Sequence, residues 1–77
     1  MMVFDKVKEI IAEELGVEED KVLLDSNLSE DLGADSLDAI ELIMAIEESF
    51  DLEIPDSEAT RIKLVSDIVK FLEEAGK

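Results

Sequence analysis

Apolar residues recur at intervals of three and four in three parts of the chain. Near the start this pattern covers residues 3–15, and Gly16 follows at a position where helices commonly end. A second helical pattern runs over about 36–50, and a third over about 65–75. These patterns predict three longer helices, each with one apolar side directed towards a core.

The connections between the predicted helices differ in length and kind. Residues 17–35 form a long connection rich in Ser, Asn and Asp, which favour turns. Scattered apolar residues indicate that this loop is ordered, namely Val22, Leu24, Leu28 and Leu32. Pro55 marks a turn before a short helical piece at about 56–61, and no stretch alternates apolar and polar residues long enough to predict a strand.

The predicted fold class is all-α. We expect one domain over residues 1–77, built as a small bundle of three longer helices plus one short helix. A long ordered loop joins the first and second helices.

The second helix carries two apolar stripes where packing needs only one. On a helical wheel at about 100° per residue, one stripe faces the core and consists of Ala39, Leu42, Ile43, Ile46 and Phe50. The other stripe, Leu37, Ile40 and Met44, lies among acidic residues on the opposite side. Two explanations are open: another helix of the bundle covers this stripe, or it is a docking site for a partner protein.

The charge of the chain favours partners with basic surfaces. There are 22 acidic residues against 7 basic ones, a net charge of -15, and residues 22–60 hold twelve Asp and Glu but no Lys or Arg. Such a surface repels nucleic acid and anionic membranes. No apolar run approaches the roughly 18 residues of a membrane span, and the N-terminal stretch lacks a signal-peptide cleavage pattern. We therefore expect a cytoplasmic protein, monomeric and without nucleic-acid partners.

The residue types that are missing exclude most catalytic chemistry. The chain has no His, Cys, Trp or Tyr, which excludes Ser-His-Asp and Cys-His triads and the usual zinc sites. We expect a protein that is not an enzyme.

Ser36 is the one hydroxyl at a distinctive position. Asp35 can cap a helix that begins at Ser36, and Asp38 lies in the first turn, where the helix dipole favours an anion. No base nearby could activate the hydroxyl. Ser36 is therefore either an ordinary solvated serine or a point that another enzyme modifies.

The stretch around this serine resembles a known family. Residues 31–56, "DLGADSLDAIELIMAIEESFDLEIPD", resemble the signature of acyl carrier proteins of the freestanding bacterial fatty-acid type. The similarity extends from "VKEIIAEELGV" to "VSDIVKFL", so it covers nearly the whole chain. In that family, a holo-carrier synthase (a phosphopantetheinyl transferase) moves 4′-phosphopantetheine from coenzyme A to the serine, and the thiol of this arm holds the acyl group as a thioester.

The resemblance implies roles for particular residues. Ser36 would carry the 4′-phosphopantetheine, with Asp35 and Leu37 beside it. The surface read by fatty-acid synthesis enzymes and acyltransferases with basic patches would comprise Leu37, Asp38, Ile40, Glu41, Met44, Glu47 and Glu48. The acyl chain would be sheltered by Ile46, Phe50, Ile54, Ala59 and Ile62.

One segment departs from the family pattern. Members commonly have hydroxyl residues just before the last helix, where this chain has "IKLV" at residues 62–65. Lys63 and Leu64 cannot act as an N-cap, so Ser66 is the candidate cap.

Two other functions compete with a fatty-acid carrier. One is a carrier of polyketide, aminoacyl or D-alanyl groups in a dedicated pathway. The other is a calcium sensor, with residues 25–36 as its loop, but Glu30 occupies the required glycine position and Ser36 the position of the bidentate Glu. The sequence therefore predicts no specific metal site. Weak divalent binding is expected at two acidic groups, which are Glu30, Asp35 and Asp38, and Glu47, Asp51, Glu53 and Asp56.

The uneven charge predicts that cations stabilise the fold. Twelve carboxylates share residues 22–60 with no cation, and folding brings these like charges together. Added salt, or magnesium or calcium at millimolar concentration, should raise the thermal midpoint measured in dilute neutral buffer. A midpoint indifferent to both salt and divalent ions would show that the charges are well dispersed in the folded chain.

Overall fold

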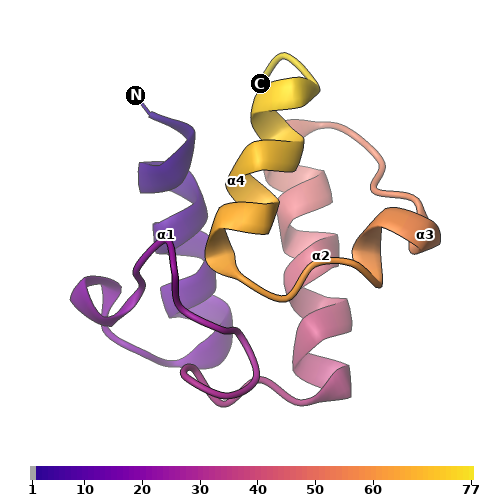
Figure 1. The fold of residues 1–77 in the computed structure, drawn as a ribbon. Coiled ribbons are helices and arrows are strands. Elements are labelled where there is room, and N and C mark those ends of the chain that lie inside the picture. Colours follow the sequence, from indigo (N-terminus) through magenta and orange to yellow (C-terminus); the bar gives the residue numbers. More distant parts are fainter. Residues whose placement is uncertain (1) are drawn as a thin grey trace.

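The computed structural model describes residues 2–77 and is helical, as predicted (Figure 1). The elements in chain order are α1 (Val3–Leu15), the 3-10 turn η1 (Glu19–Lys21), α2 (Ser36–Phe50), α3 (Asp56–Ala59) and α4 (Val65–Glu74). Within the described residues the only β-type pairing is an isolated bridge between Asn27 and Leu64. The predicted bounds of α1 and α2 are confirmed, whereas the short helix ends at Ala59, two residues before the predicted end.

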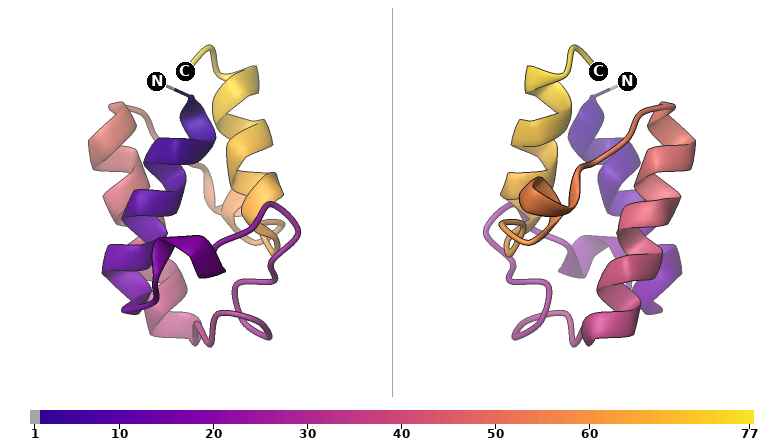
Figure 2. Two further views of the ribbon diagram at one scale, coloured as in Figure 1. Left: turned by 90° about the vertical axis from the view of Figure 1, so that its left-hand side faces the viewer. Right: turned by 90° about the vertical axis from the view of Figure 1, so that its right-hand side faces the viewer.

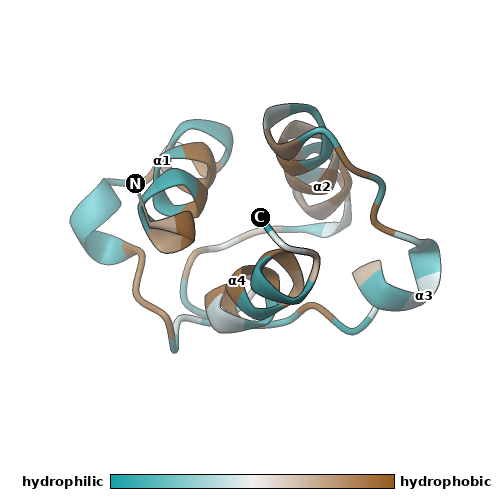
Figure 3. Ribbon diagram, turned by 90° about the horizontal axis from the view of Figure 1, so that it is seen from above, coloured by the Kyte–Doolittle hydropathy of each residue, from teal (hydrophilic) through white to brown (hydrophobic). Residues whose placement is uncertain are grey.

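The three longer helices enclose the core, and α3 lies to one side of it. Viewed from above, the apolar sides of α1, α2 and α4 face the middle of the bundle (Figure 3). In the right-hand view of Figure 2, α3 and the connection before it lie across the face between α2 and α4. This arrangement leaves α3 as a wall opposite one side of α2.

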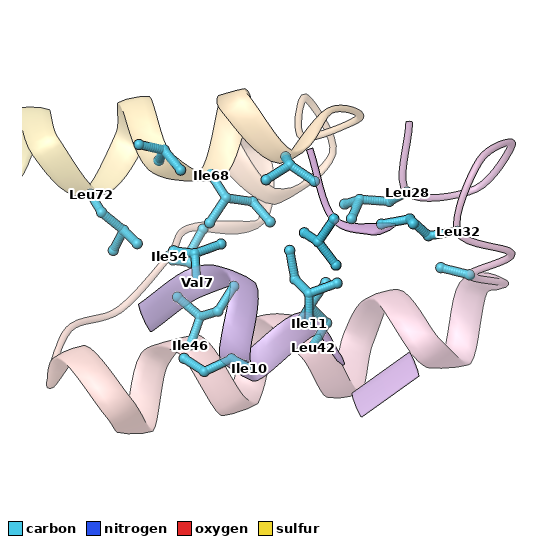
Figure 4. Close-up of a cluster of buried hydrophobic side chains, with 14 residues drawn as sticks. Val7, Ile10, Ile11, Leu28, Leu32, Leu42, Ile46, Ile54, Ile68 and Leu72 are labelled. Carbon is cyan, nitrogen blue, oxygen red and sulfur yellow. The ribbon is translucent and has the colours of Figure 1, made fainter. Parts of the chain in front are cut away.

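Segments outside the helices supply part of the core. The helices contribute Val7, Ile10, Ile11, Leu42, Ile46, Val65, Ile68, Val69 and Leu72. The connections add Val22, Leu28, Leu32, Ala34 and Ile54, several of which meet the helical side chains in Figure 4. The prediction of an ordered loop is therefore confirmed.

Two expectations about burial were wrong. Leu24 was expected to anchor the loop, but its side chain is 46% exposed; it is the backbone carbonyl of Leu24 that makes the anchoring contact, to Ser66. Ala39 was placed on the core side of the second helix, yet it is exposed. A helical wheel gives the direction of a side chain but not what lies opposite, and opposite Ala39 there are two surface hollows.

The loop before α2 is held by its own side chains. The Asn27 side-chain oxygen accepts hydrogen bonds from the N–H groups of Ser29 (3.0 Å) and Glu30 (2.9 Å). The Asn27 N–H in turn donates to an Asp31 carboxylate oxygen at 2.7 Å. Gly33 follows with a φ of 75°, in the left-handed region where a residue with a Cβ would be strained. These local bonds fix the path of the chain into α2.

The same loop bonds to the start of α4. Val65 N–H donates to the Ser26 carbonyl (3.0 Å), and Ser66 N–H donates to the Leu24 carbonyl (2.9 Å). In the opposite direction, Leu28 N–H donates to the Lys63 carbonyl (2.9 Å). Loop carbonyls therefore satisfy N–H groups that a helix start would otherwise leave free.

The expected capping role of Ser66 was wrong. The residue before α4 is Leu64, which forms no side-chain cap. Asp67, at the third helical position, instead accepts hydrogen bonds from the N–H groups of Leu64 (2.9 Å) and Lys63 (3.0 Å). These two bonds, chiefly the one from Leu64, hold the pKa of Asp67 below its ordinary value; partial burial opposes them, and the Lys70 and Lys63 cations assist.

Replacing Asp67 by Asn is expected to lower the free energy of unfolding at neutral pH by about 1 kcal/mol, because Asn keeps an acceptor oxygen but loses the negative charge that strengthens both bonds at the start of the helix. Because the pKa of Asp67 is lower in the folded chain than in the unfolded chain, its contribution is complete above the unfolded value and is lost as pH falls through the folded value. The stability difference between wild type and Asp67→Asn, measured by urea unfolding, should be constant above about pH 5 and narrow below about pH 4.

The control is Glu74→Gln, which removes one exposed carboxylate from the end of the same helix. It should leave stability within about 0.5 kcal/mol of wild type. If the Asp67→Asn difference stayed constant to the lowest pH at which both proteins fold, the charge of Asp67 would not be the stabilising element.

Candidate functional site

The start of α2 is fixed by two aspartates that bond to each other's backbone. Asp35 Oδ1 accepts a hydrogen bond from Asp38 N–H at 2.9 Å, and Asp38 Oδ2 accepts one from Asp35 N–H at 3.2 Å. This reciprocal cap fixes where the helix begins and places Ser36 as its first residue. The predicted capping role of Asp35 is confirmed.

The Ser36 side chain is exposed, and no catalytic group of the described chain is bonded to it. Among the side-chain hydrogen bonds of residues 2–77, none involves the Ser36 hydroxyl, and the nearby carboxylates of Asp35 and Asp38 are engaged with backbone N–H groups. Nothing in the described chain therefore activates this oxygen as a nucleophile. It is accessible to another molecule from the outside.

The second apolar stripe of α2 is exposed. Leu37, Ile40 and Met44 are 62%, 58% and 56% exposed, so no helix of the bundle covers them. We refer to these three residues as the docking strip, after the docking role predicted for them from the sequence. Glu41 and Glu48 are exposed around it, and Asp38 is half-buried.

Glu47 differs from the exposed Glu41 and Glu48 near the strip. Its side chain is half-buried, and its Oε2 accepts a hydrogen bond from Ile54 N–H at 2.7 Å. This carboxylate is turned towards the connection after α2 rather than being free on the surface.

Two hollows meet at Ser36. The first, which we call the α2–α3 groove, has a volume of about 640 Å³. One wall comes from α2 and consists of Ser36, Ala39, Ile40, Ile43, Met44 and Glu47. The other wall consists of Ile54, Asp56, Ala59 and Thr60. The second, the loop-side hollow, measures about 530 Å³ and lies between the start of α2, the loop at 27–30 and Ile62–Lys63.

The residues expected to shelter an acyl chain are divided among three places. Ile54 and Ala59 line the α2–α3 groove, and Ile62 lines the loop-side hollow. Ile46 is fully buried in the core, and Phe50 packs against the core; neither lines the α2–α3 groove or the loop-side hollow.

Sequence reasoning missed three lining residues, Ala39, Ile43 and Thr60. A signal for the first two was present in the sequence. The α2 residues that line the groove recur at helical intervals from Ser36 to Glu47, separated in turn by three, one, three, one and three residues. They form a stripe along α2 between its core side and the docking strip. Thr60 carries no such signal, because its place depends on how α3 packs.

The acidic groups do not form a ready-made metal site. The described residues contain no cluster of three or more His, Cys, Asp or Glu side chains placed to hold a metal ion. Weak divalent binding at Glu30, Asp35 and Asp38, or at Glu47, Asp51, Glu53 and Asp56, stays a prediction. In both groups some oxygens already accept backbone hydrogen bonds.

Comparison with known proteins identifies the family. Residues 5–72 match the family model described as a phosphopantetheine attachment site. The acyl carrier protein of Bdellovibrio bacteriovorus is 54% identical over 77 residues, covering 100% of this chain and 99% of that protein. That of Sulfurovum sp. is 56% identical over 73 residues, covering 95% and 97%. The chain belongs to the acyl carrier protein family.

A solved structure agrees with this assignment. A putative acyl carrier protein from Mycobacterium tuberculosis superposes with a TM-score of 0.86 at 28% sequence identity, over 91% of this chain and 93% of that chain. Acyl carrier proteins are carriers rather than enzymes, and their covalent cofactor is 4′-phosphopantetheine. The resemblance noted in the sequence is thereby confirmed. In the described residues no helix has both the length and the apolar character needed to span a bilayer.

The residues around Ser36 fit such a cofactor. An exposed hydroxyl at a helix start places an attached phosphodiester at the positive end of the α2 dipole. The α2–α3 groove begins at the same residue and offers mainly apolar walls to whatever the arm carries. Its volume lies within the range of roughly 300–1,000 Å³ typical of ligand sites.

Proposed function

We propose that this chain carries acyl groups as thioesters on a 4′-phosphopantetheine arm attached to Ser36, in fatty-acid biosynthesis. The observation that carries the proposal is the exposed Ser36 hydroxyl at the mouth of an apolar groove, in a chain of the acyl carrier family. We assign residues 1–77 to a single acyl-carrier domain.

In the loading step, Ser36 acts as an acceptor. Its oxygen forms a bond to the phosphorus of the phosphopantetheine moiety of coenzyme A, the bond from that phosphorus to the bridging pyrophosphate oxygen breaks, and 3′,5′-ADP leaves. The hydroxyl proton passes to a base on the transferase, because the described residues offer none at Ser36. Once bound, the arm supplies the thiol that holds the acyl group.

The docking strip and its acidic rim form the proposed contact surface for the transferase and for acyl-processing enzymes. The strip offers exposed aliphatic and thioether groups, and Asp38, Glu41 and Glu48 surround it with negative charge. A partner with a small apolar groove ringed by Lys and Arg complements this surface in both shape and charge. The thioether of Met44 adapts to partners of different shape.

An aliphatic cargo suits the groove better than an aminoacyl or D-alanyl group. Ile40, Ile43, Met44, Ile54 and Ala59 give the groove long apolar stretches of wall, which lower the free energy of a hydrocarbon chain by removing it from water. A short or charged group gains little from such walls. This difference favours fatty-acid synthesis over a dedicated aminoacyl pathway.

Replacing Ser36 by Ala should abolish loading. Incubation with coenzyme A and a phosphopantetheinyl transferase should add the mass of one arm to the wild type and none to Ser36→Ala, as measured by intact mass spectrometry. The far-ultraviolet circular dichroism should be unchanged, because the exposed Ser36 side chain makes no hydrogen bond to any of residues 2–77. Ser49→Ala, an exposed serine at the other end of α2, is the matched control and should load normally. Loading of Ser36→Ala would place the attachment site elsewhere.

Replacing Met44 by Ala should weaken binding to the transferase by about fivefold or more, because it removes an exposed apolar anchor. The free energy of unfolding should change by less than about 0.5 kcal/mol, since the side chain is 56% exposed.

Glu41→Lys should mainly lower the association rate with the transferase, by an amount that diminishes as salt is added. Surface plasmon resonance and urea unfolding give these quantities.

The controls for the docking strip are an exposed methionine and an exposed glutamate on α1 or next to it. Met2→Ala removes a methionine that is 68% exposed, and Glu9→Lys makes the same charge change as Glu41→Lys. Both should bind the transferase as the wild type does. A loss of several kcal/mol of stability in Met44→Ala would instead assign Met44 to the core.

A further inference from the structure

The connection between α2 and α3, residues 51–55, is held almost entirely by Glu47. The Glu47 backbone carbonyl accepts hydrogen bonds from Asp51 N–H and from Leu52 N–H (3.2 Å). Its carboxylate accepts the bond from Ile54 N–H at 2.7 Å. Since Pro55 has no N–H, one residue receives three of the four N–H groups of this connection.

The backbone conformation of this connection is one that its own residues do not favour. Asp51 adopts a φ of 53°, and it is the only non-glycine residue in the described chain with a positive φ. Asp tolerates the left-handed region but does not prefer it. Contacts from outside the connection, rather than the preference of Asp51, therefore keep the turn closed.

The far wall of the α2–α3 groove depends on this connection. The hydrogen bonds of residues 55–62 are internal, for example those from Glu58 and Ala59 N–H to the Pro55 carbonyl; within the described chain none reaches α1, α2 or α4. Hydrogen bonds tie the wall to the remainder of the protein only at its two ends. One end is the bond between Glu47 and Ile54; at the other end the Lys63 carbonyl accepts from Leu28 N–H, and Lys63 N–H donates to Asp67 Oδ2.

Glu47 is also the last residue of α2 that lines the groove; a separate hollow at the end of α2 shares Met44 and Glu47 with it. The groove begins at Ser36 and follows α2 for eleven residues to Glu47, about 16 Å at the helical rise. Ile54, which Glu47 holds, is 5% exposed and lines the opposite wall. The carboxylate is thus both the polar end of an apolar groove and the tie that fixes its width there.

We propose that Glu47 is a specificity-determining residue for the carried acyl group: by holding Ile54 N–H, its carboxylate fixes the length and width of the α2–α3 groove and so limits the chain that the groove shelters. This inference rests on the proposed function. Methylenes added to the chain are sheltered until the groove ends, and further ones remain in water. Release of the carboxylate lets the wall at 54–60 move away from α2, and longer chains then fit.

The first test uses the unloaded protein and needs no cofactor. Amide hydrogen exchange at Ile54, measured by NMR, should be about tenfold to a hundredfold faster in Glu47→Ala, as expected for loss of a hydrogen bond to a charged acceptor. Glu47→Gln retains an uncharged acceptor and should give an intermediate rate. Amides of the core helices, such as Ile11 and Ile68, should stay within about twofold of wild type. Glu9→Gln makes the same charge change on α1 and should leave Ile54 unaffected.

The second test uses protein loaded with straight-chain acyl groups of increasing length. The rate of thioester cleavage by hydroxylamine reports how well the groove shelters the chain. In the wild type, protection should rise with chain length to a maximum and then level off, because methylenes beyond the groove remain in water. In Glu47→Ala the maximum should move to longer chains and short chains should lose protection, with Glu47→Gln between the two and Glu9→Gln like wild type.

Several results would overturn the inference. Unchanged exchange at Ile54 in Glu47→Ala would show that the carboxylate does not hold the wall, and an equal rise at all amides would make Glu47 a general stabiliser. Faster exchange at Ile54 with an unchanged chain-length profile would remove the specificity role. Failure of the wild type to load at Ser36 would overturn the proposed function, and the specificity role with it, while the exchange experiment would still decide whether Glu47 holds Ile54.

Discussion

The backbone N–H groups at the start of α4 set a requirement that shapes much of this fold. No side chain before the helix can cap it, so the carbonyls of Leu24 and Ser26 accept two of these N–H groups. These two hydrogen bonds fix the loop against α4, and a third, from Leu28 N–H to the Lys63 carbonyl, runs in the opposite direction. Because the loop leads directly into α2, its fixed path also determines where Ser36 lies relative to Ile62 and Lys63.

A chain of 77 residues can bury only a small apolar core, and without cysteine no disulfide adds to its stability. The loop contributes to this core. Val22, Leu28, Leu32 and Ala34 place four loop side chains in the core. Helix α2 can therefore contribute only Leu42 and Ile46 as fully buried residues and leave its opposite side in solvent. Helix α2 can leave the docking strip exposed because loop side chains supply part of the core that a helix would otherwise have to supply.

Features with local causes could be predicted from the sequence, and features that depend on tertiary packing could not. The limits of α1 and α2 follow from apolar periodicity together with Gly16 and Asp35, all within a few residues of the helix ends. The wheel also placed Leu37, Ile40 and Met44 away from the core stripe, but only the structure shows that no helix covers them. The role of Ser36, by contrast, was suggested by family resemblance, since a lone serine at a helix start has no chemistry of its own.

Hydrogen bonds between residues that meet only in the folded chain could not be predicted from the sequence. Asp67 lies within α4 and caps the start of that helix, and the Glu47 carboxylate accepts a hydrogen bond from Ile54, seven residues further along the chain. Apolar periodicity places both acidic residues on the surface and indicates neither bond. The wall formed by Ala59 and Thr60 depends on where α3 lies, which a four-residue helix cannot encode by periodicity.

The docking strip and the α2–α3 groove are not separate surfaces, because Ile40 and Met44 belong to both. A helix has about 3.6 residues per turn, so side chains between two stripes contribute to each of them. A protein that covers the strip must therefore touch one wall of the groove, while Glu47 and Ile54 hold the other wall in place. The proposed recognition by a partner and the proposed shelter of the cargo therefore involve the same side chains of α2, and a substitution of Ile40 or Met44 changes both surfaces at once.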